Sequence, residues 1–445
     1  MKLSEAAQAL QTVHHGEDIT FTGCCTDSRR VIPGSLFIAL KGAHFDGHDF
    51  IISAYESGAS ASLTEIDDPD FSPMIVVDNT LRAMGSLASS WRERFDIPLV
   101  AITGSNGKTT VKEMLLSILQ RQTPVLATQG NLNNEIGVPL TLFGMDNEHA
   151  YAIVEMGANH AGEIARMTRI ARPTVALITQ CAPAHLEGFG SIEGVARAKS
   201  EIYDGLDDKG IAIINADDDF AGFWSDYTGT LRQLRFGLEQ EADINARSIR
   251  STDKGMRFDL CLPGNEFTVD LPLPGRHNIA NALAAAACAY ALNIEPALIR
   301  SGLERMTGVK GRLEKRHGIN RSTLLDDTYN ANPASLRAAL DYLKDCPGEH
   351  WLVLGDMGEL GEADRSLHAA AGEQSRKSGV EHLFTIGELS RSASEAFGNK
   401  ARHYEDIDSL IADLRSEIRP SVTLLVKASR AMRLERVVAA LEDKK

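Results

Sequence analysis

The sequence predicts an α/β protein of three domains, built around a doubly wound parallel sheet. Two observations lead to this prediction. The chain has 445 residues, enough for about three domains of roughly 150 residues each. Short apolar strands also alternate with helical stretches along it, which favours parallel pairing because each helix returns the chain to the same end of the sheet. We place the domains at residues 1–82, 83–310 and 311–445.

The first domain is predicted as a small α/β unit. Residues 36–40 and 74–77 are apolar and strand-like, and residues 49–57 are helical. A helix near 81–94 then leads to Pro98 and the central domain. Buried parallel strands read as short, continuous apolar runs. In the central domain these runs are 99–103, 152–154, 175–178 and 211–214.

The end of the central domain has a different pattern. Short alternating segments between residues 232 and 273 predict an antiparallel extension, and an alanine-rich helix follows at 278–292. The third domain is predicted as a Rossmann-like α/β unit, because apolar strands again alternate with helices. Its expected strands are 323–325, 351–354, 382–386 and 422–426.

Composition excludes several classes of protein. Hydrophobic residues make up 43% of the chain and charged residues 24%, which is ordinary for a globular protein. The net charge of −15 argues against a nucleic-acid partner. Six cysteines without metal-finger spacing indicate reduced thiols. The longest apolar run, 282–292, is shorter than the about 20 residues that span a bilayer, and no secretory signal opens the chain. We therefore expect a cytoplasmic protein without stable membrane insertion. We also expect a monomer, although none of these observations bears on the oligomeric state.

The sharpest local motif is Gly104-Ser105-Asn106-Gly107-Lys108-Thr109-Thr110, which follows a predicted strand and opens a helix. Glycines let the backbone wrap round a polyphosphate, and a helix N-terminus offers free N–H groups. Lys108 would reach the β- and γ-phosphates, and the Thr109 hydroxyl would bind Mg²⁺. The usual spacing has glycine where this chain has Ile102. A glycine-rich turn is the plain alternative, but the strand context and the Gly-Lys-Thr run favour nucleotide binding.

Three polar residues follow the phosphate loop in suggestive places. Glu155 ends an apolar strand, at the edge where open α/β sheets bind ligands, and a carboxylate there can hold the cation that bridges ATP phosphates. His185 also lies just past a strand, and Lys199 lies on a helix. Taken alone, each has a simpler interpretation: a solvated glutamate, a structural histidine and a surface lysine.

Further motifs then follow in order along the chain. They are GNLNNEIGVP at 130–139, EMGANH at 155–160, HLEGFG at 185–190, GRHNIANA at 275–282, GRLE at 311–314 and DDTYNANP at 326–333. Together with the phosphate loop, this series resembles the Mur ligase family over residues 26–430. The isoleucine at 102 agrees with the shortened loop that these ligases use.

The resemblance implies an ATP- and Mg²⁺-dependent ligase and assigns roles to individual residues. Lys108 and Thr109 would hold the ATP phosphates and one Mg²⁺. Glu155 and His185 would bind the metal pair together with Lys199, which the family carries as a carbamate. A carbamate reverses the charge of the ammonium and so attracts cations instead of repelling them.

The resemblance also implies where the substrates bind. Asn278 and Arg312 would contact the adenine and the phosphates, and Asp327 the ribose. Asn131 and Asn134 are expected near the reacting carboxylate, and with Lys108, Lys199 and His185 they complete the predicted catalytic set. Ser28, Arg29 and Lys41 are expected to contact the UDP-sugar. Asn330 and Asn332 are expected to contact the incoming amine.

The implied reaction joins D-Ala-D-Ala to UDP-N-acetylmuramoyl-tripeptide through an acyl phosphate. The GDMGELG run at 355–361 and the Asn330/Asn332 pair resemble the dipeptide-adding branch of the family. A ligase that adds diaminopimelate or lysine is the nearest alternative, but the Asp-Asn-Pro-Arg run of the diaminopimelate branch does not occur. A P-loop kinase or mechanochemical ATPase would share only residues 104–110. A non-catalytic regulator would be expected to have lost Lys108, Glu155 or His185, and all three are present.

Overall fold

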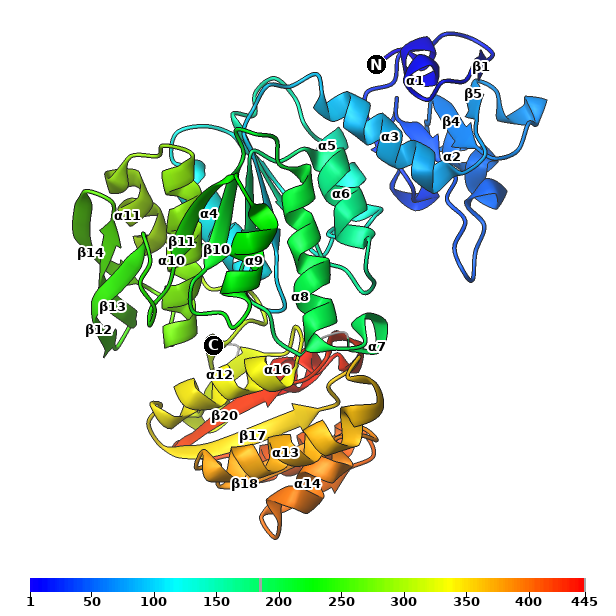
Figure 1. Ribbon diagram of the computed structural model, residues 1–445. Coiled ribbons are helices and arrows are strands. Elements are labelled where there is room, and N and C mark those ends of the chain that lie inside the picture. The colour runs from blue at the N-terminus through cyan, green and yellow to red at the C-terminus, as the bar shows by residue number, and fades with distance from the viewer. Residues whose placement is uncertain (184–185, 444–445) are drawn as a thin grey trace.

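The computed structural model describes residues 1–183 and 186–443. Three α/β units follow one another along the chain, and the central unit lies between the other two (Figure 1). Each unit has its own mainly parallel sheet. The predicted fold class is therefore confirmed. His185, a predicted metal ligand, lies outside the described residues.

The N-terminal unit is a five-stranded sheet with three helices. The sheet has the order β1-β5-β4-β3-β2, and β1 is its antiparallel strand. The strands are β1 (His14–His15), β2 (Cys24–Cys25), β3 (Leu36–Ile38), β4 (Ala61–Thr64) and β5 (Met74–Val76). The helices are α1 (Leu3–Ala9), α2 (Ile51–Glu56) and α3 (Thr80–Arg92).

Helix α3 connects the N-terminal unit to the central one (Figure 1). Ala83, Met84 and Leu87 are buried in the N-terminal core, whereas Ala88 is buried in the central core. The predicted division between residues 82 and 83 thus falls inside a helix that both cores share, and it stays a prediction.

The central unit is a six-stranded parallel sheet with the order β11-β10-β9-β6-β8-β7. Its middle strand β6 is buried along its whole length, as expected for a strand covered on both faces. The strands are β6 (Leu99–Thr103), β7 (Val125–Ala127), β8 (Tyr151–Glu155), β9 (Val175–Ile178), β10 (Ile211–Asn215) and β11 (Arg232–Phe236). The helices are α4 (Lys108–Leu119), α5 (Gly137–Phe143), α6 (Glu163–Ala171), α7 (Leu186–Phe189), α8 (Ile192–Ser200), α9 (Ala221–Thr228), α10 (Arg276–Ala291) and α11 (Pro296–Glu304).

The region 232–273 corrects part of the prediction. A separate antiparallel sheet does form, from β12 (Asn245–Thr252), β13 (Gly255–Leu262) and β14 (Asn265–Leu271). Strand β11, however, pairs in parallel with β10 at the edge of the main sheet. Its alternating pattern suggested an antiparallel strand, but it arises because β11 is an edge strand with half-exposed side chains.

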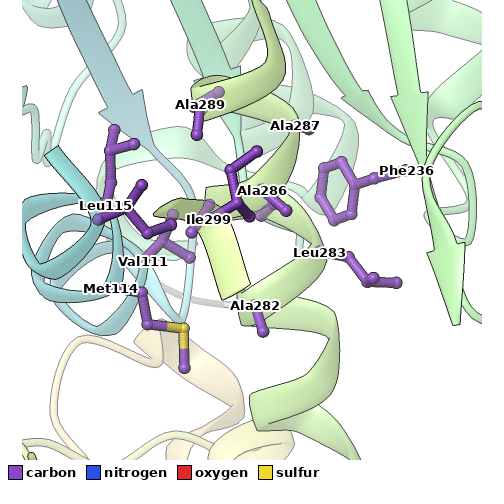
Figure 2. Close-up of a cluster of buried hydrophobic side chains, with 14 of the residues drawn as sticks. Val111, Met114, Leu115, Phe236, Ala282, Leu283, Ala286, Ala287, Ala289 and Ile299 are labelled. Atoms are coloured by element: carbon purple, nitrogen blue, oxygen red, sulfur yellow. The ribbon is translucent and has the colours of Figure 1, made fainter. Parts of the chain in front are cut away.

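Helix α10 joins the two sheets of the central unit into one core. Val111 and Leu115 of α4 lie on one side of α10, and Leu283 of α10 lies on the other side, beside Phe236 of β11 (Figure 2). Ile299 of α11 belongs to the same cluster. Small side chains on α10 allow it to approach α4 closely, and the larger Val111 of α4 fills the space between them.

The C-terminal unit is a six-stranded sheet with the order β15-β16-β20-β17-β18-β19, in which β15 is antiparallel. The polar strands β15 and β19 were not expected from the sequence. The strands are β15 (Glu314–His317), β16 (Thr323–Asp327), β17 (Glu349–Gly355), β18 (His382–Ile386), β19 (Ala401–Tyr404) and β20 (Val422–Lys427). The helices are α12 (Pro333–Lys344), α13 (Asp364–Lys377), α14 (Arg391–Phe397), α15 (Ile407–Glu417) and α16 (Glu435–Leu441).

Two other expectations can be compared with the fold. All six cysteines are free. Among the helices of residues 1–183 and 186–443, none is long and apolar enough to cross a membrane.

Candidate active site

A cavity of about 490 Å³ lies between the central and C-terminal units. It opens at the carboxyl ends of β6, β8 and β16, the edge at which α/β sheets bind ligands. Most of the predicted site residues line it: Gly104, Ser105, Asn106, Gly107, Lys108, Thr110, Asn131, Asn134, Glu155, Lys199, Asn278, Arg312, Asp327, Asn330 and Asn332. Thr109 is not among the lining residues but contacts two of them.

The phosphate loop joins β6 to α4 in a conformation that depends on its glycines. Gly104 has φ +147°, and a Cβ there would lie 1.8 Å from the Thr179 hydroxyl oxygen. Gly107 is left-handed, with φ +83°. The Lys108 ammonium donates to the Gly104 carbonyl at 2.6 Å, so the lysine folds back over the loop. Burial lowers the pKa of Lys108, which is unfavourable for a cation unless an anion binds beside it.

Glu155, at the end of β8, connects the phosphate loop to the loop before α5 through its carboxylate. Its side chain is buried, and its two carboxylate oxygens have different partners. One accepts from the Thr109 hydroxyl at 3.0 Å, and the other from the Asn133 amide at 2.8 Å. Arg312 donates to Thr109 at 3.1 Å. Residues of both units therefore meet at the threonine predicted to bind Mg²⁺.

Lys199 lies on α8 and is only 4% exposed. Burial, and next the nearby positive charge of Lys108, lower the pKa of Lys199 to about 7. About half of this lysine is then a neutral amine at neutral pH. A neutral amine can react with CO₂, whereas an ammonium cannot, so the environment suits the carbamate that the family resemblance implies.

The C-terminal unit contributes Asp327 and Arg312. Asp327 ends β16, accepts from the backbone N–H of Leu313 at 3.1 Å and forms an ion pair with Lys427. Lys427 is 1% exposed and ends the adjacent strand β20. The Arg312 guanidinium lies 4.2 Å from the centre of the Tyr329 ring, which holds this cation against the cavity wall.

Asn134, Asn278 and Asn332 are held by hydrogen bonds of their own side chains. Asn134 accepts from the backbone N–H of Gly137 at 2.9 Å at the start of α5. The Asn278 amide donates to the Pro274 carbonyl at 2.7 Å. Asn332 caps α12, and Asn131 is exposed on the loop before α5. These bonds fix the walls of the cavity before any ligand binds.

The residues predicted to contact the UDP-sugar lie elsewhere. Ser28, Arg29 and Lys41 belong to the N-terminal unit and do not line the cavity. The Arg29 side chain is 86% exposed and pairs with Asp27 at 2.9 Å. Lys41 lies 3.5 Å from Asp46. The structure therefore does not bring these three side chains to the phosphate loop.

Sequence reasoning missed several residues of the cavity. Asn133 holds Glu155, and Lys427 holds Asp327. Asn133 lies in the GNLNNEIGVP motif, so its position between Asn131 and Asn134 was an available signal. Lys427 ends an apolar strand, as Glu155 does, and the same argument would have found it.

Comparisons with known proteins agree with this geometry. Three family models match: the Mur ligase family catalytic domain at residues 20–92, the Mur ligase middle domain at 102–289, and the Mur ligase glutamate ligase domain at 311–430. The chain is 43% identical to the UDP-N-acetylmuramoyl-tripeptide–D-alanyl-D-alanine ligase of Escherichia coli over 99% of this chain and 98% of that protein.

Solved structures give the same relationship. MurF from Acinetobacter baumannii has a TM-score of 0.92 at 36% identity, covering 98% of this chain and 97% of that one. MurF from Thermotoga maritima in complex with ADP has a TM-score of 0.85 at 28% identity, covering 95% and 98%. Sequence, fold and the arrangement of the cavity lead to the same conclusion. The chain belongs to the Mur ligase family.

Proposed function

We propose that this protein is an ATP-dependent ligase that adds D-Ala-D-Ala to UDP-N-acetylmuramoyl-tripeptide in peptidoglycan precursor synthesis. The observation that supports it most is the full-length similarity to a relative named for that reaction. The phosphate loop and Glu155 face Arg312 and Asp327 across one cavity, an arrangement suited to holding a nucleotide between two units.

An amide forms from a carboxylate only after the acyl group is activated. In the first step a carboxylate oxygen of the tripeptide attacks the γ-phosphorus of ATP, and ADP leaves. In the second step the amine nitrogen of the dipeptide attacks the carbonyl carbon, phosphate leaves and the nitrogen loses its proton. Lys108 and Arg312 would offset the negative charge that develops on the phosphoryl oxygens. Asn131 and Asn134 would orient the reacting carboxylate.

The residues present fit Mg²⁺. Thr109 and Glu155 offer oxygen ligands 3.0 Å apart, and Mg²⁺ binds through one or two carboxylates plus substrate phosphates. Among the described residues, no group of three His, Cys, Asp or Glu side chains gathers into a metal site of its own. The cation would bind together with the nucleotide, with His185 and a carbamate on Lys199 as further ligands. When bound, it would neutralise phosphate charge.

The remaining predicted contacts complete the proposal. Asn278 would contact the adenine and Asp327 the ribose, while Asn330 would meet the dipeptide. Ser28, Arg29 and Lys41 would bind the UDP-sugar from the N-terminal unit. We further propose that the enzyme is a monomer in the cytoplasm, where its free thiols stay reduced.

One experiment separates this function from its nearest alternative. Phosphate release would be measured with ATP and Mg²⁺ in two reactions, one with UDP-N-acetylmuramoyl-tripeptide and D-Ala-D-Ala and one with UDP-N-acetylmuramoyl-dipeptide and diaminopimelate. We expect release, and a new amide product, with D-Ala-D-Ala. Turnover with UDP-N-acetylmuramoyl-dipeptide and diaminopimelate instead would refute the assignment.

A further inference from the structure

Two asparagines 226 residues apart form an amide pair between the central and C-terminal units. The Asn332 side-chain amide donates to the Asn106 side-chain oxygen at 2.8 Å, and the Asn106 amide lies 3.4 Å from the Asn332 oxygen. Asn106 belongs to the phosphate loop, and Asn332 begins α12. Asn332 is 6% exposed, so water competes little for its bonds.

The hydrogen bonds around Asn332 determine which way its amide points. Its side-chain oxygen accepts from the backbone N–H of Ser335 at 2.9 Å, and the Ser335 hydroxyl accepts from the Asn332 backbone N–H at 3.0 Å. This capping box uses the oxygen of Asn332. The amide nitrogen is therefore the donor toward the phosphate loop, and the facing atom of Asn106 must be its oxygen.

Both partners are tied to parts of the molecule that hold the nucleotide. The Asn106 carbonyl accepts from the Thr179 hydroxyl at 2.6 Å, and the next residue, Gly107, opens α4. On the other side, Asn332 is two residues from Asn330, whose carbonyl accepts from Lys427, the ion-pair partner of Asp327. The pair thus couples the position of the phosphate loop to that of the C-terminal cavity wall.

We propose that Asn106 and Asn332 are positioning residues that hold the C-terminal unit closed over the phosphate loop while the acyl phosphate exists. This inference rests on the proposed function, and for Asn332 it replaces the predicted contact with the dipeptide. Closure matters because water competes with the amine. Attack by water on the acyl phosphate restores the carboxylate and releases phosphate, so ATP is consumed without an amide.

The test measures phosphate and amide product in the same reaction, at saturating ATP, UDP-N-acetylmuramoyl-tripeptide and D-Ala-D-Ala. Asn332→Ser keeps a capping side chain but removes the side-chain amide that donates to Asn106, and Asn106→Ala leaves the cap intact. The matched control is Asn79→Ser, which alters the cap of α3 far from the cavity. Losing one hydrogen bond shifts the opening equilibrium about fivefold, so we expect a several-fold rise in phosphate released without amide in both variants, and none in the control.

The outcomes are distinct. The double variant should release no more phosphate without amide than the worse single variant, because both changes break the same hydrogen bond. The proposal would be overturned if the excess phosphate of the two single variants added up in the double variant. It would also be overturned if Asn106→Ala released one phosphate for each amide formed. Excess phosphate in Asn332→Ser alone, which disappears at dipeptide concentrations above those that saturate the wild type, would support the substrate contact and refute the closure role. Failure of the wild-type chain to form an amide would instead refute the proposed function.

Discussion

Replacing Asp327 should affect both nucleotide binding and stability, because its carboxylate has a buried counter-charge. Lys427 is 1% exposed, and it donates to the Asn330 carbonyl at 3.0 Å in addition to its ion pair with Asp327. The two charged residues are register partners at the ends of β16 and β20. Asp327→Asn leaves the lysine ammonium buried without an opposite charge.

The size of the effect follows from the surroundings. Removing one partner of a buried ion pair costs about 3–5 kcal/mol. Because the Asp327 side chain is 14% exposed and Lys427 keeps its carbonyl partner, we expect the lower end, about 3 kcal/mol. If Asp327 also binds the ribose, as proposed, losing that charge-assisted hydrogen bond should separately weaken ATP binding by about 1.5–3 kcal/mol, roughly 10- to 150-fold.

Urea denaturation of the full chain and the KM for ATP measure the two effects independently. Asp327→Asn/Lys427→Met should recover much of the stability, since it removes the stranded charge, but should not recover nucleotide affinity. Asp341→Asn is the control, because Asp341 forms an exposed pair with Lys344, and it should change stability by less than about 1 kcal/mol. A double variant as unstable as Asp327→Asn would refute the ion-pair argument, and an unchanged KM would refute the ribose contact.

Three further predictions follow from the same structure. Lys108→Ala should abolish turnover with little change in melting temperature, because the ammonium donates to the Gly104 carbonyl of its own loop and is not part of a hydrophobic core; appreciable residual activity would contradict this. Lys199→Ala should be nearly inactive and partly rescued by acetate, whereas acetate should not rescue Lys108→Ala. Activation of the wild type by bicarbonate should rise with pH through about 7, since the reactive neutral amine grows from about a tenth at pH 6 to about nine tenths at pH 8; a flat profile would exclude the carbamate. Leu283→Ala, in the core where α10 meets Phe236 of β11, should lower the free energy of unfolding by about 2–5 kcal/mol in chemical denaturation. A smaller loss would mean that the neighbouring side chains move into the space that the leucine leaves.

Local patterns were enough to predict the strands that form the centres of the sheets. The runs at 99–103, 175–178 and 422–426 are continuous and apolar, and each is a buried parallel strand. Such strands are covered on both faces, so every position is apolar and the run is easy to recognise. The phosphate loop was equally easy to predict, because its glycines and its Gly-Lys-Thr run supply the backbone conformation and the positive charge that polyphosphate binding needs, all within a few residues.

Strands at the edges of the sheets were harder to predict from the sequence. Strands β15 and β19 contain mostly polar residues, and they join the C-terminal sheet by backbone hydrogen bonds that leave little trace in the side-chain pattern. Strand β11 alternates as an antiparallel strand would, yet it pairs in parallel with β10. The direction of pairing at an edge depends on how the chain returns to the sheet, which composition does not record.

The sequence by itself determined the fold class, the phosphate loop, fifteen of the residues that line the cavity and, through its motifs, the family. Only the tertiary structure decided how those residues are paired. It joins Asn106 to Asn332 and Asp327 to Lys427, and it gives Lys199 a pKa of about 7. The physical reason is that a motif reports the backbone geometry and burial of its own few residues. A hydrogen bond across a domain boundary, or a pKa set by burial and a neighbouring charge, depends on which distant segments come together.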